Sequence, residues 1–387
     1  LEFDKLHAHL RERYPLLHAT LKLEHVGHSL LYTWAGSDPA AQPFAFLAHQ
    51  DTVPIAPGTE VLWKKPPFAG VIEDGFVWGR GTLDNKSNLI TQMEAVEALL
   101  QAGFKPRRTV YLIAGHDEEV GGERGAVAIV ELFKQRKVRL EYVIDEGLVV
   151  TEGILPGVAQ PLALVGLAEK GSVSLLLTAQ AAPGHSSMPP SQAGQSAIGM
   201  LSAALVRLDQ QPMPGGVQGA AAAMFAAIAP ELPFGQRLAL SNLWLLRPVV
   251  EGMLGKSAAT NAMMRTSTAM TVLKAGQADN VLPGRADATV NFRILPGDTK
   301  EQVLDHVKTE LAQALGEGKV AVQVLPGAKD GSKVAPTGSS QYRLMNRTIR
   351  EVFPGTLVAP GLMVAATDSV HYEPLSDHIF KFSPVRA

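Results

Sequence analysis

Short apolar runs alternate with helical patterns over the first 150 residues. The runs are typical of buried strands and lie at 44–48 (FAFLA), 110–114 (VYLIA) and 142–144 (YVI). Between the first two runs, apolar residues recur every three or four positions, as on one helix face, at Leu89, Met93, Val96 and Leu100. A second helical pattern covers 126–134. This order predicts an α/β fold with a doubly wound, mostly parallel sheet, in which ligands bind at the carboxyl ends of the strands.

The pattern changes to strict alternation after Lys170. Residues 286–294 place an apolar side chain at every second position, which predicts a half-buried antiparallel strand. Another candidate strand covers 264–273, and a helix is expected to begin after Asp298 or Thr299. These elements predict a smaller α+β domain.

The smaller domain is expected to interrupt the larger one. A helical pattern at 341–353 and further apolar strands resume the first pattern, so the chain is expected to return to the first sheet. We therefore expect a larger domain formed by 1–170 and 326–387, with the smaller domain at 171–325. The stretch 210–256 holds several Pro and Gly residues and an Ala-rich helix, and its sequence predicts no function.

Composition and charge narrow the classes of function. The 387 residues are 46% hydrophobic and 19% charged, which is typical of a globular chain with two domains. The formal net charge of −2 provides no overall field that would attract nucleic acid or an anionic membrane. The longest apolar stretch, 219–230, is too short to span a bilayer of about 30 Å. Because there are no cysteines, histidines and carboxylates are the only strong metal ligands.

Histidine and acidic residues follow each strand of the first domain. The clusters are His49-Gln50-Asp51, 115–119 (GHDEE) and Asp145-Glu146, and Asp84 joins them just before the first helix. Each cluster alone has an ordinary explanation, as a hydrogen-bonded pair, a solvated loop or a helix cap. Together, at one edge of one sheet, their repulsion and desolvation would be costly without cations. We interpret them as a site for two metal ions. Zinc fits such ligands, and Mn or Co could replace it.

Two features of the clusters predict their chemistry. Glu118 and Glu119 are adjacent, so both cannot easily point at the same ion. One of them can bind metal while the other acts as a general base on the attacking water. Asp51 lies two residues beyond His49 and can hold the free N–H of its imidazole, which fixes the tautomer.

The motifs around these residues resemble a known family. Residues 48–54 (AHQDTVP), 78–86 (WGRGTLDNK), 115–122 (GHDEEVGG) and 145–147 (DEG) are similar to those of the co-catalytic zinc aminoacylase and carboxypeptidase family. The greatest likeness is to its carboxypeptidase S branch, the Gly-Xaa carboxypeptidases, which includes secreted N-acyl amino acid hydrolases. The resemblance implies the following roles: His49 and Asp145 on one zinc ion, Glu119 on the other, Asp84 bridging both, Glu118 as general base and Asp51 behind His49.

The smaller domain resembles the lid domain of the same family. Its matching motifs are 168–171 (AEKG), 184–187 (GHSS), 265–266 (RT), 280–283 (NVLP) and 291–299 (NFRILPGDT). The resemblance implies that His185 stabilises the oxyanion and that Asn280 and Arg293 hold the carboxylate of the substrate. It also implies a homodimer formed through the lid. Without the resemblance, Arg293 reads as a surface-strand arginine and His185 as a loop histidine.

The chain departs from the family pattern near its end. Ala365 and Ala366 precede Thr367-Asp368, where the family has a glycine pair. The last metal ligand of the family is a His that follows the Phe-Ser-Pro stretch, whereas His371 and His378 precede that stretch here. We expect the second zinc to lack one ligand in the 387-residue sequence. We also expect the encoded protein to continue into a segment that bears a His.

The expected function is zinc-dependent hydrolysis of an amide bond, in a dipeptide or an N-acyl amino acid with a free C-terminal carboxylate. One alternative is an aminopeptidase or dipeptidase on the same metal core, which needs an amine anchor in place of Arg293. The other is a catalytically silent relative that acts as a binding protein. The expected partners are small-molecule substrates, with no nucleic acid and no membrane span. The resemblance alone suggests an extracytoplasmic location.

Overall fold

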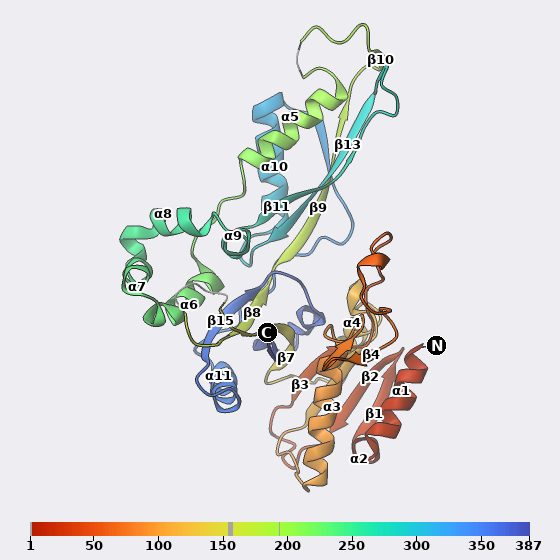
Figure 1. Ribbon diagram of the computed structural model, residues 1–387, viewed down its shortest axis with the longest axis vertical. Helices are drawn as coiled ribbons and strands as arrows, with labels where there is room; N and C mark the ends of the chain where they lie inside the picture. The colour runs from red at the N-terminus through yellow and green to blue at the C-terminus, as the bar shows by residue number, and fades with distance from the viewer. Residues whose placement is uncertain (1, 154–157, 193) are drawn as a thin grey trace. The chain divides into compact units, whose positions relative to one another are not determined.

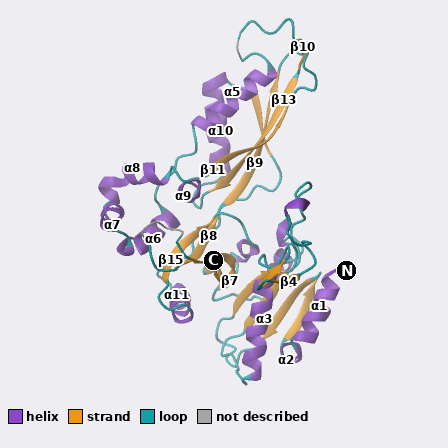
Figure 2. Cartoon of the chain, in the orientation of Figure 1, coloured by secondary structure: helices purple, strands orange, loops and turns teal. Residues whose placement is uncertain are grey.

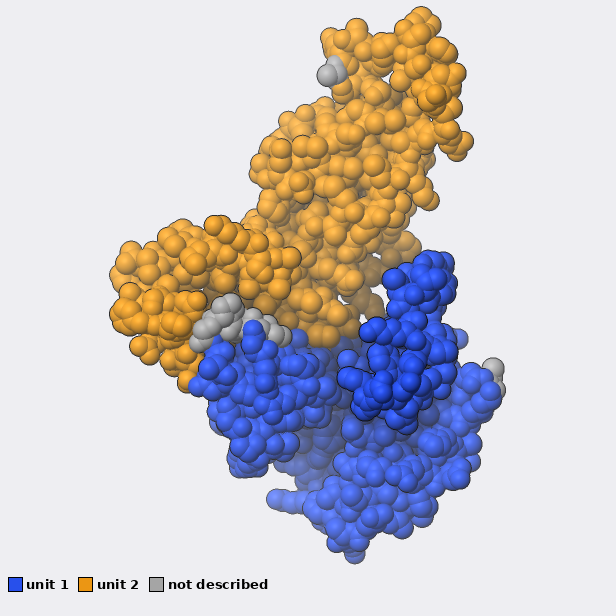
Figure 3. Space-filling view, in the orientation of Figure 1, with its two compact units in different colours: residues 1–167, 335–359, 367–387 blue, residues 168–334, 360–366 orange. Residues whose placement is uncertain are grey.

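The computed structural model describes residues 2–153, 158–192 and 194–387. The chain divides into two compact units, each with its own core (Figure 3). Unit 1 comprises Leu1–Leu167, Ala335–Ala359 and Thr367–Ala387, and unit 2 comprises Ala168–Val334 and Pro360–Ala366. The chain therefore leaves unit 1, builds most of unit 2 and returns.

Unit 1 is built on an eight-stranded sheet of order β1-β2-β6-β3-β7-β16-β8-β15 (Figure 1). The central strands β6, β3, β7 and β16 are parallel, and β1, β2 and β8 pair antiparallel with their neighbours. The prediction of an α/β fold with a mostly parallel sheet is confirmed. The strands of the sheet are β1 (Lys22–Val26), β2 (Ser29–Trp34), β3 (Phe44–His49), β6 (Val110–Gly115), β7 (Val143–Thr151), β8 (Leu162–Glu169), β15 (Leu357–Met363) and β16 (Ile379–Arg386).

Helices cover both faces of this sheet, because alternate residues of its strands point to opposite sides. Ala48 and Leu112 pack on one face with Leu17 and Met93 of the helices α2 and α3, while Leu47 packs on the other with α4. The remaining elements are α1 (Glu2–Arg13), α2 (Pro15–Thr20), η1 (Glu60–Leu62), β4 (Val71–Glu73), β5 (Phe76–Trp78), α3 (Lys86–Gln101), η2 (Glu118–Val120), α4 (Ala126–Gln135), α11 (Ser340–Val352) and η4 (Asp368–Tyr372).

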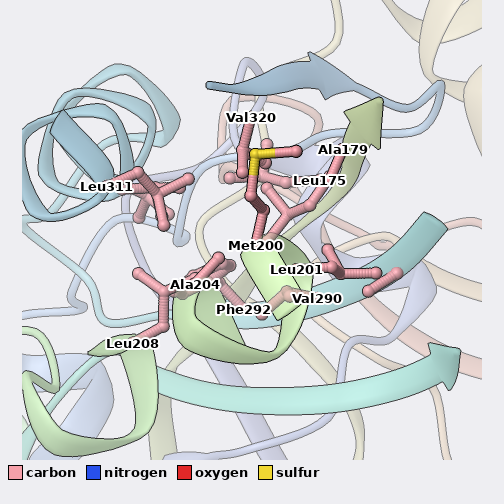
Figure 4. Packing of buried hydrophobic residues seen from close by; sticks show 14 of the residues in the cluster. Leu175, Ala179, Met200, Leu201, Ala204, Leu208, Val290, Phe292, Leu311 and Val320 are labelled. Carbon is pink, nitrogen blue, oxygen red and sulfur yellow. The ribbon is translucent and has the colours of Figure 1, made fainter. Parts of the chain in front are cut away.

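Unit 2 contains an antiparallel four-stranded sheet of order β11-β13-β9-β14, with α5 and α10 packed on one face (Figure 2). Its core includes Leu175, Met200, Phe292 and Leu311 (Figure 4). The elements are β9 (Gly171–Gln180), β10 (Gly184–His185), α5 (Ala197–Gln210), α6 (Gly219–Ile228), η3 (Ala229–Glu231), α7 (Phe234–Ser241), α8 (Leu243–Leu254), α9 (Ala258–Met264), β11 (Ser267–Lys274), β12 (Val281–Leu282), β13 (Arg285–Ile294), α10 (Lys300–Leu315) and β14 (Val320–Val324).

Local chemistry explains where several of these elements begin. The alternation at 286–294 becomes β13, and a capping box in which Thr299 and Gln302 bond each other's backbone N–H opens α10. The strand expected at 264–273 begins only at Ser267, because Met264 ends α9. The stretch 210–256 contains the expected Ala-rich helix, α6, followed by η3, α7 and α8. Among the described residues, no helix is both long and apolar enough to cross a membrane.

Candidate metal centre

The acidic clusters meet at one edge of the unit 1 sheet. His49 ends β3, Glu118 and Glu119 lie in η2 directly after β6, and Glu146 lies in β7. Because β6, β3 and β7 are adjacent and parallel, the residues that follow them gather at the same edge. Asp84 joins them just before Asn85, the residue that precedes α3.

His49 stands at the centre of this acidic cluster and is only 2% exposed. Its Nε2 lies 2.9 Å from Asp84 Oδ1, 3.2 Å from Glu146 Oε1 and 3.9 Å from Glu118 Oε2. Its Nδ1 lies 3.2 Å from Asp51 Oδ1. Asp51 therefore occupies the far side of the ring, so Nε2 faces the other carboxylates, as a metal-ligating imidazole does.

Two groups of described residues have the spacing of metal ligands. One group is His49, Asp84 and Glu146, and the other is His49, Glu118 and Glu119, with ligand atoms within 4.8 Å of one another in each group. Asp145, which the family resemblance places on a zinc ion, belongs to neither group. Its Oδ1 accepts a hydrogen bond from the backbone N–H of Glu146. The geometry therefore offers Glu146 in the position expected for Asp145.

A bulge in β7 explains why Glu146 turns toward His49. The paired positions advance from Asp145 to Leu148 on β7 while they advance only from Lys381 to Phe382 on β16. Such a bulge redirects the side chains of the extra residues. Gly147 completes it with φ +153°, where a Cβ would lie 2.6 Å from Lys381 Cβ.

The loop after β6 holds the two glutamates apart. The buried side chain of Asp117 accepts a hydrogen bond from the Arg124 N–H, and its backbone carbonyl accepts one from the Gly122 N–H. These bonds close the loop around η2. The Glu119 N–H donates to Asp51 Oδ2, and Glu119 Oε1 accepts from the Val53 N–H. Glu119 is thereby fixed by its backbone and its side chain.

The electrostatics of the cluster favour bound cations. Burial alone would lower the pKa of His49, but Asp51, Asp84 and Glu146 outweigh it and raise the pKa. Burial raises the pKa of Glu118 to about 9, and the carboxylates around it add to this rise. One imidazole cannot neutralise so many buried acids. The donor set of one imidazole and several carboxylates fits divalent metal ions.

Asp368 is a buried member of the cluster that the sequence did not single out. Its carboxylate lies against two glycines: a Cβ on Gly115 would lie 2.6 Å from Asp368 Oδ2, and one on Gly122 would clash with Oδ1. Burial and the charge of Asp145 raise the pKa of Asp368 well above its usual range. In the sequence, only its place in the Thr367-Asp368 motif pointed to a role in the site.

Two histidines near the end of the chain bind backbone carbonyls. His371 Nε2 lies 3.1 Å from the Gly121 carbonyl oxygen, and His378 Nδ1 lies 3.1 Å from that of Glu141. Neither histidine belongs to the ligand groups formed by the described residues. That neither takes the place of the last metal ligand of the family stays a prediction.

Unit 1 contains a cavity of about 320 Å³ that reaches the acidic cluster. It lies between α3 and α11, over the strands β3, β7 and β16, and its lining is mostly apolar. Asp145 and Glu146 form part of its wall.

Unit 2 separates the three residues that the family resemblance assigns to substrate binding. His185 and Asn280 are neighbours, because β10 pairs with β12 and the Ser186 N–H donates to the Asn280 carbonyl. Arg293 lies near the other end of β13, eight residues beyond Arg285. At about 3.3 Å per residue, this strand alone separates Arg293 from the β10–β12 pair by roughly 26 Å. Within one chain, Asn280 and Arg293 therefore do not meet.

Comparisons with known proteins identify the family of this chain. Residues 45–384 match Peptidase family M20/M25/M40. The chain is 42% identical over 382 residues to the Xenopus tropicalis N-fatty-acyl-amino acid synthase/hydrolase PM20D1, covering 97% of this chain and 72% of the relative. It is 30% identical over 429 residues to Saccharomyces cerevisiae carboxypeptidase S, covering 98% of this chain and 72% of the relative.

Solved structures support the fold. The M20 family metallo-carboxypeptidase Sso-CP2 of Sulfolobus solfataricus superposes with a TM-score of 0.66 at 19% identity, covering 98% of this chain and 85% of that one. A Bacillus subtilis protein described as a dinuclear metal-binding peptidase from the M20 family superposes with a TM-score of 0.55 at 13% identity, covering 100% and 82%. The family resemblance predicted from the motifs is confirmed. The chain belongs to Peptidase family M20/M25/M40.

Proposed function

We propose that this chain hydrolyses the amide bond of N-acyl amino acids, or of dipeptides, that carry a free C-terminal carboxylate. As a member of its family the chain is a hydrolase of the metallopeptidase class, and the family binds two metal ions. The observation that carries the proposal is the pair of ligand groups that share His49. The names of the similar relatives, an N-fatty-acyl-amino acid hydrolase and a carboxypeptidase, support this choice of substrate.

The distances around His49 support one set of metal ligands, and the family resemblance supports the other. By their spacing, His49, Asp84 and Glu146 would hold the first ion. By the resemblance, Asp84 and Glu119 would hold the second. Glu146 thus replaces Asp145 in the assignment. We propose zinc as the natural metal, since it suits a mixed imidazole and carboxylate set, with Mn or Co as substitutes. When bound, such ions would supply Lewis-acid chemistry, which polarises a carbonyl group and lowers the pKa of water.

Side chains of unit 1 handle the proton. Glu118 belongs to the same ligand group as Glu119, and its Oε2 lies 3.9 Å from His49 Nε2. We assign it as the general base that takes a proton from water and returns it to the leaving amine. Asp51 Oδ1 lies 3.2 Å from His49 Nδ1, where it would hold the proton on that nitrogen and leave Nε2 for the metal.

We propose that two copies of unit 2 complete the substrate site. Arg293 would hold the substrate carboxylate, while His185 and Asn280, too distant from it along β13, would serve a second copy of the chain. His185 would stabilise the oxyanion there. The edge strand β11 is exposed along most of its length and is free to pair with its counterpart in a homodimer.

The test compares Glu118→Gln with Glu123→Gln, an exposed glutamate of the same loop, in the zinc-loaded protein. We expect Glu118→Gln to keep its metal and lose about 10²–10⁴-fold in kcat on an N-acyl amino acid, while Glu123→Gln remains active. Near-native turnover of Glu118→Gln would remove it as the base. A preference for free α-amino substrates would favour an aminopeptidase or dipeptidase. A chain that holds two zinc ions and is inactive on every substrate would favour the silent binding protein.

A further inference from the structure

The helices α7 and α8 expose an unusual amount of apolar surface. Six large apolar side chains of these helices are solvent-exposed, and Trp244 is 82% exposed. We call this surface the apolar hairpin; it consists of Phe234, Leu238, Trp244, Leu245, Val249 and Met253. Exposed apolar side chains gathered on two helices that pack together mark a site of interaction, since single exposed apolar residues are ordinary but clusters are not.

The apolar residues of the hairpin follow helical spacing. Phe234 and Leu238 are four residues apart on α7, and Leu245, Val249 and Met253 repeat at the same interval on α8. Each helix therefore presents one apolar stripe. Yet α7 has no buried residue and α8 buries only Val250. The main packing partners of α7 are η3, α6 and α8, so this stripe does not serve the core of unit 2.

The charge of this segment is opposite in sign to that of the whole chain. Between 232 and 256 there are three basic residues, Arg237, Arg247 and Lys256, and one acid, Glu251, which gives three minus one, or +2, against −2 overall. The three basic residues are exposed. Glu251 is engaged internally: its Oε1 accepts from the Val217 N–H and lies 3.6 Å from Arg247. The hairpin therefore presents cations beside its apolar stripe.

We propose that the apolar hairpin docks on the surface of a lipid bilayer that contains anionic headgroups. The six apolar side chains enter the boundary between headgroups and acyl chains, and the Arg and Lys side chains reach phosphate groups. An exposed Trp suits this boundary, because one edge of its ring is polar. At 12 residues α8 is about 18 Å long, so it lies on the bilayer without spanning it.

The same charges argue against a second copy as the occupant. Two copies of the segment 232–256, each of net charge +2, would repel each other, and its one carboxylate, Glu251, already lies beside Arg247 of its own helix. A bilayer also fits the proposed function, on which this link rests, because an N-acyl amino acid with a long chain partitions into membranes. Docking would bring unit 2 to the place where such substrates gather.

The first experiment measures sedimentation of the full zinc-loaded chain with vesicles of phosphatidylcholine and phosphatidylglycerol. We expect the joint substitution Trp244→Ser, Val249→Ser and Met253→Ser to weaken binding at least about tenfold. The matched control replaces Ile198 and Val206 by Ser, apolar residues of α5 that are 45% and 55% exposed. The control should bind as the unaltered chain does. Equal losses in the two variants, or no binding by the unaltered chain, would overturn the proposal.

The second experiment locates the contact with vesicles that carry brominated acyl chains, which quench nearby tryptophans. We expect the fluorescence of the unaltered chain to be quenched, and the change to disappear in Trp244→Phe, which keeps vesicle binding. Quenching that persists in Trp244→Phe would place the contact elsewhere and contradict the proposal. Light scattering gives a third outcome: a dimer that the triple substitution dissociates, together with no vesicle binding, would assign the hairpin to self-association instead.

A soluble short-chain N-acyl amino acid separates this inference from the proposed function. The triple variant should hydrolyse it at the rate of the unaltered chain, because none of its three positions belongs to the metal centre. Vesicle binding by a chain that hydrolyses no amide would contradict the proposed function and leave the docking supported. Hydrolysis without vesicle binding would overturn the docking alone.

Discussion

Replacing Glu118 by Gln is expected to stabilise the metal-free protein at neutral pH, although it removes the proposed base. Burial, with added repulsion from Asp368, Glu146 and Asp145, raises the pKa of Glu118 from 4.5 to about 9. Since the folded pKa lies above the unfolded one, the resulting cost to stability is absent below about pH 4.5 and grows as the pH rises toward 9. At about 1.4 kcal/mol per pH unit, this cost reaches about 3 kcal/mol at pH 7. A Gln side chain does not titrate and avoids it.

The assay is urea unfolding in EDTA at several pH values between about 5.5 and 7.5, with Trp34, buried in unit 1, as a fluorescent probe. The gain of Glu118→Gln over the unaltered chain should widen by about 1.4 kcal/mol per pH unit. Glu123→Gln, in the same loop but exposed, should show no such trend. A gain that is independent of pH, or a loss of stability, would refute the reasoning. Added zinc should shrink the gain, because cations stabilise the Glu118 carboxylate.

Three further predictions follow from contacts described above. Gly122→Ala should lower the free energy of unfolding by about 2–4 kcal/mol, because Gly122 has a φ of +71° and an added Cβ would clash with the Asp368 carboxylate. The control Gly121→Ala has a φ of +105° but an added Cβ meets no atom, so it should destabilise the protein less. Equal losses in the two variants would contradict the contact with Asp368. Lys170→Met should lower the free energy of unfolding of unit 2 by about 2–4 kcal/mol, measured by thermal unfolding. The reason is that the buried Lys170 ammonium donates hydrogen bonds to the Ala262 and Arg265 carbonyls and to the Ser267 hydroxyl. A loss below about 1 kcal/mol would show that these acceptors find other donors. Metal analysis after dialysis of the 387-residue chain should find about one ion, because the second has only two protein ligands; two retained ions would contradict the assignment.

The sequence predicted the edge of the sheet where the site lies. The runs before His49 and Gly115 are continuous and apolar, as expected for parallel strands buried on both faces, and they became β3 and β6. The residues that follow such strands lie at one edge of the sheet, whatever the conformation of the loops. The cluster around His49 could therefore be predicted from local patterns. The helix with its face at Leu89 and Met93 became α3 for the same reason.

The sequence did not predict which of two adjacent acids faces His49. Alternation allows only one of Asp145 and Glu146 on a given side, and the bulge at Gly147 that selects Glu146 depends on pairing with β16, more than 230 residues later. The buried position of Asp368 depends likewise on two glycines far away in the sequence.

Nor did the motifs show that Asn280 and Arg293 lie apart. Motifs give residue types, whereas the separation comes from the length and straightness of β13 between them. The apolar hairpin escaped prediction for another reason: a Leu-rich helix normally indicates a core, and only the exposure of its side chains shows that this stripe faces outward.

The position of β16 has a consequence for how the protein is made. This strand lies between β7 and β8 in the sheet, yet the ribosome synthesises it after all of its neighbours. Most of unit 2, from Ala168 to Val334, is continuous and can fold while the rest of unit 1 is still being translated. Until β16 arrives, β7 and β8, which pair with each other only at Val150–Ala163 and Thr151–Leu162, present open edges along the rest of their length that can recruit strands from other nascent chains. Slow translation of the codons for β16, or a premature stop before Ile379, would therefore produce aggregation of the chain rather than a shortened enzyme.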